Sequence, residues 1–392
     1  MSVVINGGGI IGLILAIMLS KLTRGNLEIS LIEQSSPNSY DSSSFIRIPR
    51  IIFISRSSYF ELIKIGIKPI LLNYSTVIKQ IEISEYTKFS KIFIRSQDYQ
   101  LSELGYVIEL HEIKKQLFEF LKKETTVSVY CPATIDYIKY EKMENIVFLN
   151  DGSQIITKLI VAADGSCSKL SSDYGIQWFR WNYNQVAVTA EIITEIPNFN
   201  QAFERFIIFG SMALLPISSN KSFLIWCISR DSQKEVLQWD QNKFSLELQK
   251  FFGWRLGKFL NVGVRNFFDL WLGYAKKHIA HRLVLVGNAA QNLHPVAGQG
   301  FNLGIRDIMT LSKIVYQALC DNKDIGDPDI LHAYQTHRRL DQYKIIVLTD
   351  GLIRLFNNHY CSLVIARRLG LFCIGYSDFL KKILVKSILI GK

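Results

Sequence analysis

The beginning of the chain constrains the fold more than any other feature. A short apolar strand at residues 3–6 leads into a G-x-G-x-x-G spacing formed by Gly7, Gly9 and Gly12, which opens an apolar helix. A second strand then ends at Glu33, about 20 positions after the glycines. In dinucleotide-binding folds such glycines allow a tight turn, close approach of a pyrophosphate and close helix packing, and the acidic residue accepts ribose hydroxyls. The order therefore predicts a βαβ unit that binds a nucleotide.

A second glycine-rich loop lies far downstream, within residues 283–307. An apolar strand at residues 283–286 precedes it, and a helix is predicted to begin near Phe301. The loop itself contains Gly287, Pro295, Gly298 and Gly300. A helix N-terminus presents free N–H groups and partial positive charge, which suit an anion or an electron-rich ring. The segment predicts part of a ligand site, the alternative being an ordinary strand–loop–helix connection.

Composition narrows the class of protein. With 392 residues, 48% of them hydrophobic and 20% charged, the chain is long enough for one large or two ordinary globular domains. The net charge is +11, but lysine and arginine are scattered, so no nucleic-acid partner is predicted and contact with anionic lipid stays open. The six cysteines lack C-x-x-C spacing, so no metal site is predicted. Without a signal peptide or a bilayer-length apolar stretch, a cytoplasmic location is expected, with peripheral contact to the inner face of the membrane as the open alternative.

The hydrophobic pattern changes along the chain. From about residue 186 to 264 it becomes β-rich and aromatic, and the chain then returns to the strand at residues 283–286. We expect an α/β fold with an α+β insert. The nucleotide-binding domain is predicted at residues 1–75, 101–180 and 270–340, the β-rich substrate domain at 76–100 and 181–269, and a helical C-terminal region at 341–392.

Three motifs in order carry a resemblance to a known family. They are G-G-G-I-I-G at residues 7–12, V-A-A-D-G at 161–165 and G-N-A-A-Q-N-L-H-P-V-A-G-Q-G-F-N-L-G at 287–304. Together they resemble the single-component FAD-dependent aromatic hydroxylases. The variant Gly287-Asn288, in place of the usual Gly-Asp, is similar to the ubiquinone-biosynthesis branch and its 2-polyprenyl-6-methoxyphenol hydroxylase subgroup, and so is A-F-E-R-F at 202–206. The resemblance covers nearly the whole chain. It implies a Rossmann-like FAD-binding domain interrupted by a β-rich substrate domain, as in the p-hydroxybenzoate hydroxylase-type fold.

The resemblance implies a reaction. The expected protein is an FAD-dependent monooxygenase that hydroxylates a polyprenylated methoxyphenol ring in ubiquinone biosynthesis, through a flavin C4a-hydroperoxide, with NAD(P)H as electron donor and O2 as co-substrate. Its expected partners are the phenol substrate, other ubiquinone-biosynthesis proteins and the membrane surface. Two alternatives stay open: a flavin-dependent prenyl reductase, and a non-catalytic FAD-binding subunit of the ubiquinone assembly.

The resemblance also implies the cofactor-binding residues. Gly7, Gly9 and Gly12 would hold the FAD pyrophosphate and Glu33 the ribose. Asp164 and Gly165 would support the pyrophosphate and the passing nicotinamide, and Gly287 and Asn288 the ribityl or pyrophosphate region. The isoalloxazine ring would be lined by Pro295, Gly298, Gly300, Phe301 and Asn302. Arg50 stands where the family has an arginine near the flavin, but Ile48-Pro49 replaces the family's Asp-Gly, so Arg47 in that role or a surface position for Arg50 stays open.

Candidates for the chemistry come from the loop and the β-rich insert. His294 and Pro295 are candidates for a catalytic role, with a structural role in the loop as the alternative for His294. The predicted substrate pocket consists of Phe203, Phe206, Leu214, Pro216 and Trp226, with a place in the protein core as the alternative for its aromatic residues. For Glu204 and Arg205, which lie in the same motif, a simple surface pair is the structural alternative.

Overall fold

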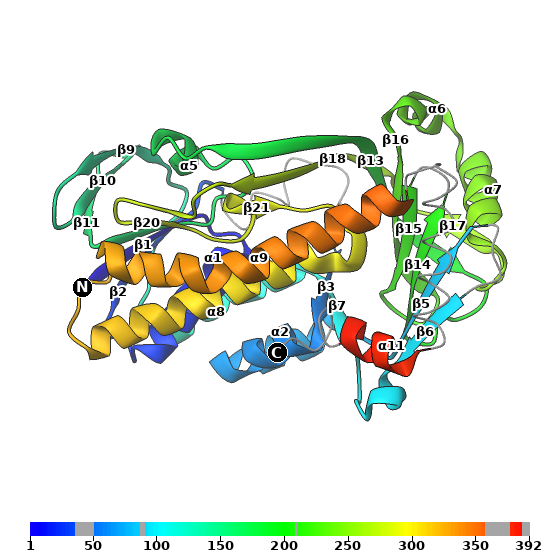
Figure 1. The fold of residues 1–392 in the computed structure, drawn as a ribbon, viewed down its shortest axis with the longest axis horizontal. Helices are drawn as coiled ribbons and strands as arrows, with labels where there is room; N and C mark the ends of the chain where they lie inside the picture. Colours follow the sequence, from blue (N-terminus) through cyan, green and yellow to red (C-terminus); the bar gives the residue numbers. More distant parts are fainter. Residues whose placement is uncertain (36–50, 87–90, 208–209, 357–376, 386–392) are drawn as a thin grey trace.

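Two β-sheets at opposite ends of an elongated molecule organise the fold (Figure 1). They are seen in a computed structural model that describes residues 1–35, 51–86, 91–207, 210–356 and 377–385. The N-terminal strand lies in the sheet at one end, and two long helices run along the molecule toward the other. The α/β class with a β-rich insert, predicted from the sequence, is confirmed.

The first sheet is parallel, except for a short edge strand, and has the order β19-β20-β12-β1-β2-β8. Its strands are β1 (Ser2–Asn6), β2 (Glu28–Ile32), β8 (Ser128–Tyr130), β12 (Leu159–Ala162), β19 (Ile279–Ala280) and β20 (Leu283–Leu285). The central strands are apolar throughout because both faces are covered. Val3 and Ile5 pack against helices, whereas Val4 packs on the opposite side against a β-meander.

Helices cover one face of this sheet. They are α1 (Ile10–Leu22), α4 (Leu110–Glu124) and α8 (Gln299–Cys320), with α9 (Pro328–Phe356) lying alongside α8 (Figure 1). Helix α1 is buried continuously from Gly12 to Ser20, which explains why its sequence is apolar on every side. No helix among the described residues is long and apolar enough to span a lipid bilayer.

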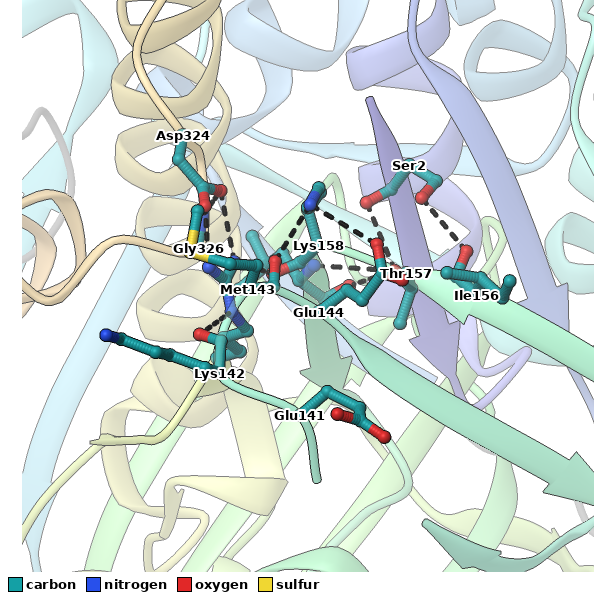
Figure 2. A network of polar contacts seen from close by, with 12 residues as sticks. Ser2, Glu141, Lys142, Met143, Glu144, Ile156, Thr157, Lys158, Asp324 and Gly326 are labelled. Carbon is teal, nitrogen blue, oxygen red and sulfur yellow. Dashed lines mark hydrogen bonds and ion pairs between the residues drawn. The ribbon is translucent and has the colours of Figure 1, made fainter. Parts of the chain in front are cut away.

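A β-meander covers the other face of the parallel sheet. It consists of β9 (Ile135–Tyr140), β10 (Asn145–Leu149) and β11 (Gln154–Thr157), and α5 (Lys169–Asp173) lies beside it. Figure 2 shows how its connections to the rest of the fold are tied together. Arg282, before β20, binds both carboxylate oxygens of Asp324 at 3.0 and 2.6 Å and also donates to the carbonyl of Lys158 at 2.9 Å. One guanidinium group therefore joins the meander, the parallel sheet and the α8–α9 connection.

A small antiparallel sheet joins the two ends of the molecule. It has the order β3-β7-β4 and consists of β3 (Ile51–Ser55), β4 (Ser75–Ile78) and β7 (Gly105–Glu109). Two helices, α2 (Arg56–Leu62) and α3 (Lys68–Asn73), follow β3. Phe53 of β3 packs among apolar residues of the second large sheet, so the small sheet connects the two cores.

The second large sheet follows the path β21-β18-β13-β16-β15-β14-β5-β6, with β17 pairing to β13. Its strands are β5 (Gln80–Glu85), β6 (Lys91–Arg95), β13 (Trp178–Thr194), β14 (Gln201–Ile207), β15 (Gly210–Pro216), β16 (Lys221–Ser229), β17 (Phe259–Val262), β18 (Asn266–Ala275) and β21 (Gln291–Asn292). Strand β13 runs from the parallel-sheet end into this sheet (Figure 1). Helices α6 (Gln233–Gln238) and α7 (Gln241–Phe252) border it, and α11 (Asp378–Val385) lies near β5 and β6.

The ion pair between Arg282 and Asp324 generates a pH-dependent prediction. Burial alone would raise the pKa of the Asp324 carboxyl, but hydrogen bonds from Arg282 and the Gly326 N–H, together with the charges of Arg282 and Lys158, lower it overall. The stabilisation is therefore present above the ordinary aspartate value of about 3.9 and is lost as the pH falls below it. Asp324→Asn should reduce the free energy of unfolding by about 3 kcal/mol at pH 7, because Arg282 is left buried without its partner. The difference from wild type should shrink toward pH 3. Urea denaturation at both pH values measures it.

The matched control is Asp321→Asn, which removes an exposed pair with Lys323 at 3.6 Å. Exposed pairs contribute about 0–1 kcal/mol, so this variant should behave like wild type at both pH values. Equal effects from the two substitutions would contradict a structural role for the buried pair.

Candidate functional site

The turn between β1 and α1 has the geometry of a nucleotide cradle. Gly7 adopts φ +114°, a backbone conformation that other residues rarely take. The Gly8 N–H donates to Glu33 Oε2 at 2.5 Å, and Lys114 Nζ lies 3.3 Å from Glu33 Oε1. Each carboxylate oxygen has a second lone pair, so Glu33 can still accept a ribose hydroxyl.

The glycines of this turn differ in what surrounds them. A Cβ on Gly7 or Gly12 would collide with backbone, namely with Ala163 and with the Gly7 carbonyl oxygen respectively. A Cβ on Gly9 would meet no heavy atom within 4 Å. Gly7 and Gly12 are therefore required by the protein itself, whereas the space beside Gly9 is open, as a bound pyrophosphate needs.

Asp164 lies immediately beyond β12, beside this turn. Its Oδ2 accepts from Asn6 Nδ2 at 3.1 Å, while its Oδ1 is buried without a hydrogen-bond partner among the described residues. Burial raises the pKa of the Asp164 carboxyl, and the Ser168 side chain opposes the rise. An ionised carboxylate only accepts hydrogen bonds, so this atom suits a cofactor hydroxyl better than a phosphate oxygen. Next to it, Gly165 has φ +87° and open space at its Cα.

The glycine-rich loop, residues 287–298, lies at the carboxyl end of β20 and leads into α8. Gly287 is buried with φ +58°, and the Asn288 that follows it is exposed. Gly298 has φ +59° and is the N-cap of α8, which begins at Gln299, two residues before the predicted start. A Cβ on Gly300 would meet nothing within 4 Å, so the first turn of α8 has an open side. Pro295 and Phe301 are partly exposed beside it.

Asn302 has a role that the sequence did not indicate. Its Oδ1 accepts from the Ser55 N–H at 2.8 Å, and its Nδ2 donates to the carbonyls of Phe53 at 3.1 Å and Gly298 at 2.9 Å. The side chain thus joins β3 to the start of α8. Its amide oxygen and nitrogen are engaged within the protein, so we expect Asn302 to shape the predicted flavin site rather than to bind the ring through its side chain.

Asp307 of α8 holds the glycine-rich loop in place through hydrogen bonds of its buried carboxylate. Its carboxylate is fully buried and accepts from the Gly287 N–H at 3.2 Å, Gln291 Nε2 at 2.7 Å, Arg338 Nε at 2.7 Å and Gln342 Nε2 at 2.9 Å. The sequence analysis did not single out Asp307. The available signal was a charged residue four positions from Leu303 and Leu311 on one buried helix face.

His294 is placed as a structural residue of the loop. Its Nδ1 accepts from the Val296 N–H at 3.3 Å, so Nε2 carries the proton and donates to Gln185 Oε1 at 3.2 Å. Burial lowers the pKa of His294 to about 3, so the ring is neutral at ordinary pH. This placement favours the structural alternative over proton transfer by His294.

Most of the predicted pocket residues lie on the wrong face of the second large sheet. Phe203, Leu214 and Trp226 are buried against α7, where Phe203 packs on Phe252 with ring centroids 5.2 Å apart. Pro216 shares their face, because successive side chains of a strand alternate. We call this side, closed by α7, the outer face. These four residues form or border a structural core there, which favours the core alternative over a place in a substrate pocket.

The opposite, inner face of the sheet is turned toward the glycine-rich loop. Gln185 of β13 contacts His294 from this face, and Phe206 stacks on Phe356 at the end of α9 with centroids 3.5 Å apart. Ala213 and Ile225 on this face are only partly buried, unlike their neighbours on the outer face. Of the five predicted pocket residues, Phe206 therefore lies on the side that a substrate beside the flavin would occupy.

The surface pair considered for Glu204 and Arg205 does not form. Adjacent residues of β14 point to opposite faces of the sheet. Arg205 donates to the carbonyl of Phe251 at 2.6 Å and to Ser84 Oγ at 3.2 Å on the outer face. Glu204 points to the inner face with a buried, unpartnered Oε1. That alternative failed because it assumed that both residues are exposed.

Two further predictions concern an arginine near the flavin and the absence of a metal site. Arg50, with Arg47 and Ile48-Pro49, lies outside the described residues. Within the described part of the chain, no group of three or more His, Cys, Asp or Glu residues is placed to hold a metal ion.

A pair of glycine substitutions tests the cradle. Gly9→Val adds its side chain to open space at φ −66°, so the free energy of unfolding without cofactor should stay near that of wild type, while FAD affinity should fall by at least about tenfold. Gly12→Ala should instead lower the free energy of unfolding by about 1–3 kcal/mol through its collision with Gly7. Urea denaturation and flavin-fluorescence titration separate the two effects. A Gly9→Val protein with unchanged FAD affinity would place the pyrophosphate elsewhere.

Asp307→Asn tests the support beneath the loop. The neutral amide leaves Arg338 buried without its carboxylate and presents a donor to other donors, so the free energy of unfolding should fall by about 3–5 kcal/mol. FAD affinity should fall with it, because Gly287 loses its acceptor. The control is Asp341→Asn, which touches the same Arg338 but is 32% exposed and should cost about 1 kcal/mol or less. Equal losses would show that Asp307 has no special role.

Comparison with known proteins connects this geometry to a family. The family model described as "FAD binding domain" matches residues 111–347, more than half of the chain. Ubiquinone hydroxylase UbiL of Rhodospirillum rubrum is 29% identical over 98% of this chain and 88% of its own length. Human ubiquinone biosynthesis monooxygenase COQ6 is 29% identical over 94% of this chain and 88% of its own. The 3-demethoxyubiquinol 3-hydroxylase of Escherichia coli is 26% identical over 97% and 96%.

Solved structures share the fold at lower sequence identity. The p-nitrophenol 4-monooxygenase PnpA of Pseudomonas putida superposes with a TM-score of 0.79 at 14% identity, covering 98% of this chain and 96% of its own. HpxO of Klebsiella pneumoniae, solved with FAD and uric acid, gives a TM-score of 0.76 at 15% identity, with 100% and 98% covered. These likenesses confirm the fold predicted from the sequence. The glycine cradle, the open first turn of α8 and the family match lead to one conclusion: the chain belongs to the FAD-binding-domain family and is an FAD-dependent monooxygenase.

Proposed function

We propose that the protein hydroxylates the ring of a polyprenylated methoxyphenol in ubiquinone biosynthesis, using NAD(P)H and O2. The observation that carries this proposal is the set of relatives that align with nearly the whole chain. UbiL and the 3-demethoxyubiquinol 3-hydroxylase are named as hydroxylases and COQ6 as a ubiquinone biosynthesis monooxygenase, and each alignment covers at least 94% of this chain. Both large sheets therefore fall within the aligned region.

The inner face of the second large sheet supports an apolar phenol as the substrate. Ala213, Leu215 and Ile225 are partly exposed there, and the same side bears Phe206. A ring with a prenyl chain can bury apolar surface on such a face at about 25 cal/mol per Å². Around Ala213 and Ile225 the described side chains of this face are mostly apolar, with Glu204 as the adjacent carboxyl, a composition that fits a phenol better than a highly charged substrate.

The residues of the cradle fit FAD and have separable tasks. The open space at Gly9 and Gly165 accommodates the pyrophosphate, and the unpartnered Oδ1 of Asp164 accepts a hydroxyl of the cofactor. The first turn of α8 presents backbone N–H groups and partial positive charge, which stabilise negative charge on a ring placed against Gly300. When bound, FAD supplies the electron transfer and oxygen activation that side chains cannot.

Peripheral contact with a membrane is part of the proposal. Phe379 of α11 is 71% exposed, and Lys382 follows it on the same short helix. An exposed aromatic side chain beside lysine is suited to the surface of an anionic bilayer, where a prenylated substrate resides. We propose that the protein takes up its substrate from that surface.

The experiment is a product assay on FAD-loaded protein with 2-methoxy-6-geranylphenol as a short-chain substrate. We expect the phenol to stimulate NAD(P)H oxidation, and the product to contain one oxygen atom from ¹⁸O-labelled O2 by mass spectrometry. Product with saturated prenyl double bonds and no label would identify a prenyl reductase. Tight FAD binding without phenol-stimulated oxidation of NADH or NADPH would instead favour a non-catalytic subunit.

A further inference from the structure

One row of side chains crosses the inner face of the second large sheet. Backbone pairing places Glu204 opposite Ala213, Ala213 opposite Ile225, and Ile225 opposite Thr189. The row therefore runs over β14, β15, β16 and β13 and spans about 14 Å at the usual strand spacing. It combines an apolar centre with a polar group at each end.

Two residues next to this row, Gln185 and Phe53, contact the glycine-rich loop that forms part of the predicted flavin site. Gln185, on the same face of β13 as Thr189, contacts His294 of the glycine-rich loop. Phe53 packs in one cluster with Ile225 and also lies against Gly298, where an added Cβ would come within 2.9 Å of it. A phenol placed between the loop and the sheet would thus lie on this row.

Two polar atoms on the row lack hydrogen-bond partners among the described residues: Glu204 Oε1 and Thr189 Oγ1. A buried carboxylate oxygen without a hydrogen-bond partner is costly, and an unsatisfied buried polar group in a native protein often marks a catalytic or binding role. Of these two groups, only the carboxylate can take a proton from a phenol. We propose that Glu204 is the general base that deprotonates the substrate hydroxyl before the ring is hydroxylated.

The proposed step is a simple proton transfer, and it rests on the proposed phenol substrate. The O–H bond of the phenol breaks, its proton forms a new O–H bond with Glu204 Oε1, and the electron pair stays on the phenolate oxygen. The extra electron density reaches the ring carbons ortho and para to that oxygen, which are the carbons that an electrophilic oxygen attacks. No electrons leave the substrate in this step.

The electrostatic surroundings suit a base that works near neutral pH. Burial raises the pKa of Glu204 to about 7, and the Ser211 side chain opposes the rise by hydrogen bonding. Burial raises the pKa of the neighbouring Cys227 thiol to about 12, and the charge of Glu204 adds to the rise, so this thiol stays neutral. Other titratable groups on this face are Glu85 on β5, the ion pair of Glu191 on β13 with Lys221 on β16 at 2.7 Å, and Tyr183, which donates to Asp350 of α9 at 3.1 Å.

The test compares wild type with Glu204→Gln in the FAD-loaded protein, using 2-methoxy-6-geranylphenol. For wild type, kcat/KM for the oxygenated product should rise with pH to a plateau above about pH 7, because the carboxyl must be ionised to accept a proton. In Glu204→Gln this rise of kcat/KM with pH should be absent, and kcat/KM at pH 7 should be about 10²-fold lower than in wild type. Its activity should recover as the pH approaches about 10, where a phenol ionises in solution. An analogue with fluorine beside the hydroxyl, which ionises more readily, should restore it at lower pH.

Two controls keep the test specific. Glu191→Gln removes a carboxylate on the same face of the neighbouring part of the sheet, in β13, where it pairs with Lys221 at 2.7 Å, and should keep the wild-type pH profile. The thermal midpoint of Glu204→Gln should exceed that of wild type above pH 7, because a carboxyl with a raised pKa destabilises the folded state once it ionises. A lowered midpoint with activity that neither high pH nor the fluorinated analogue restores would show a structural role.

The outcomes separate this inference from the proposed function. A wild-type protein that never oxygenates the phenol overturns the proposed function and the role of Glu204 with it. A wild type that oxygenates the phenol, beside a Glu204→Gln variant of similar activity and identical pH profile, overturns the role of Glu204 alone.

Discussion

The buried carboxylate of Asp307 is the interaction on which the geometry of the site depends. It accepts hydrogen bonds from the loop at Gly287, from β21 at Gln291, and from α9 at Arg338 and Gln342. Because removing any partner of a buried charge costs several kcal/mol, these segments are held in one arrangement. The glycines allow the backbone conformation of the loop, and the hydrogen bonds to the Asp307 carboxylate stabilise that conformation over others. Because Asp307 belongs to α8, the same hydrogen bonds fix the orientation of the first turn of α8 relative to the loop.

Local patterns predicted the elements that depend on neighbouring residues. The G-x-G-x-x-G turn, the strand ending at Glu33 and the loop leading into α8 each follow from a few adjacent residues, and each lies where it was expected. The Asp307 network could not be predicted in this way, because its donors are 16 to 35 positions away and follow no fixed spacing. A satisfied buried charge becomes visible only when the chain is folded.

The two faces of the second large sheet show a different limit of sequence interpretation. The alternation in A-F-E-R-F separates Phe203 and Arg205 from Glu204 and Phe206, but it does not say which set meets the cofactor. That assignment depends on α7, which lies about 40 positions later in the chain and covers the outer face. Large aromatic residues were therefore predicted in the pocket, whereas the structure uses most of them to attach α7.

Separating the two faces also affects how such a protein can change over generations. A fully buried core of the second sheet lies on the side of α7, while the side toward the loop carries small or partly exposed residues such as Ala213 and Ile225. Exchanging these for larger or smaller side chains would reshape the space for a ring without disturbing the core beneath. A lineage built on this scaffold can therefore explore new aromatic substrates through single substitutions, each tolerated by the fold before it becomes useful to the chemistry.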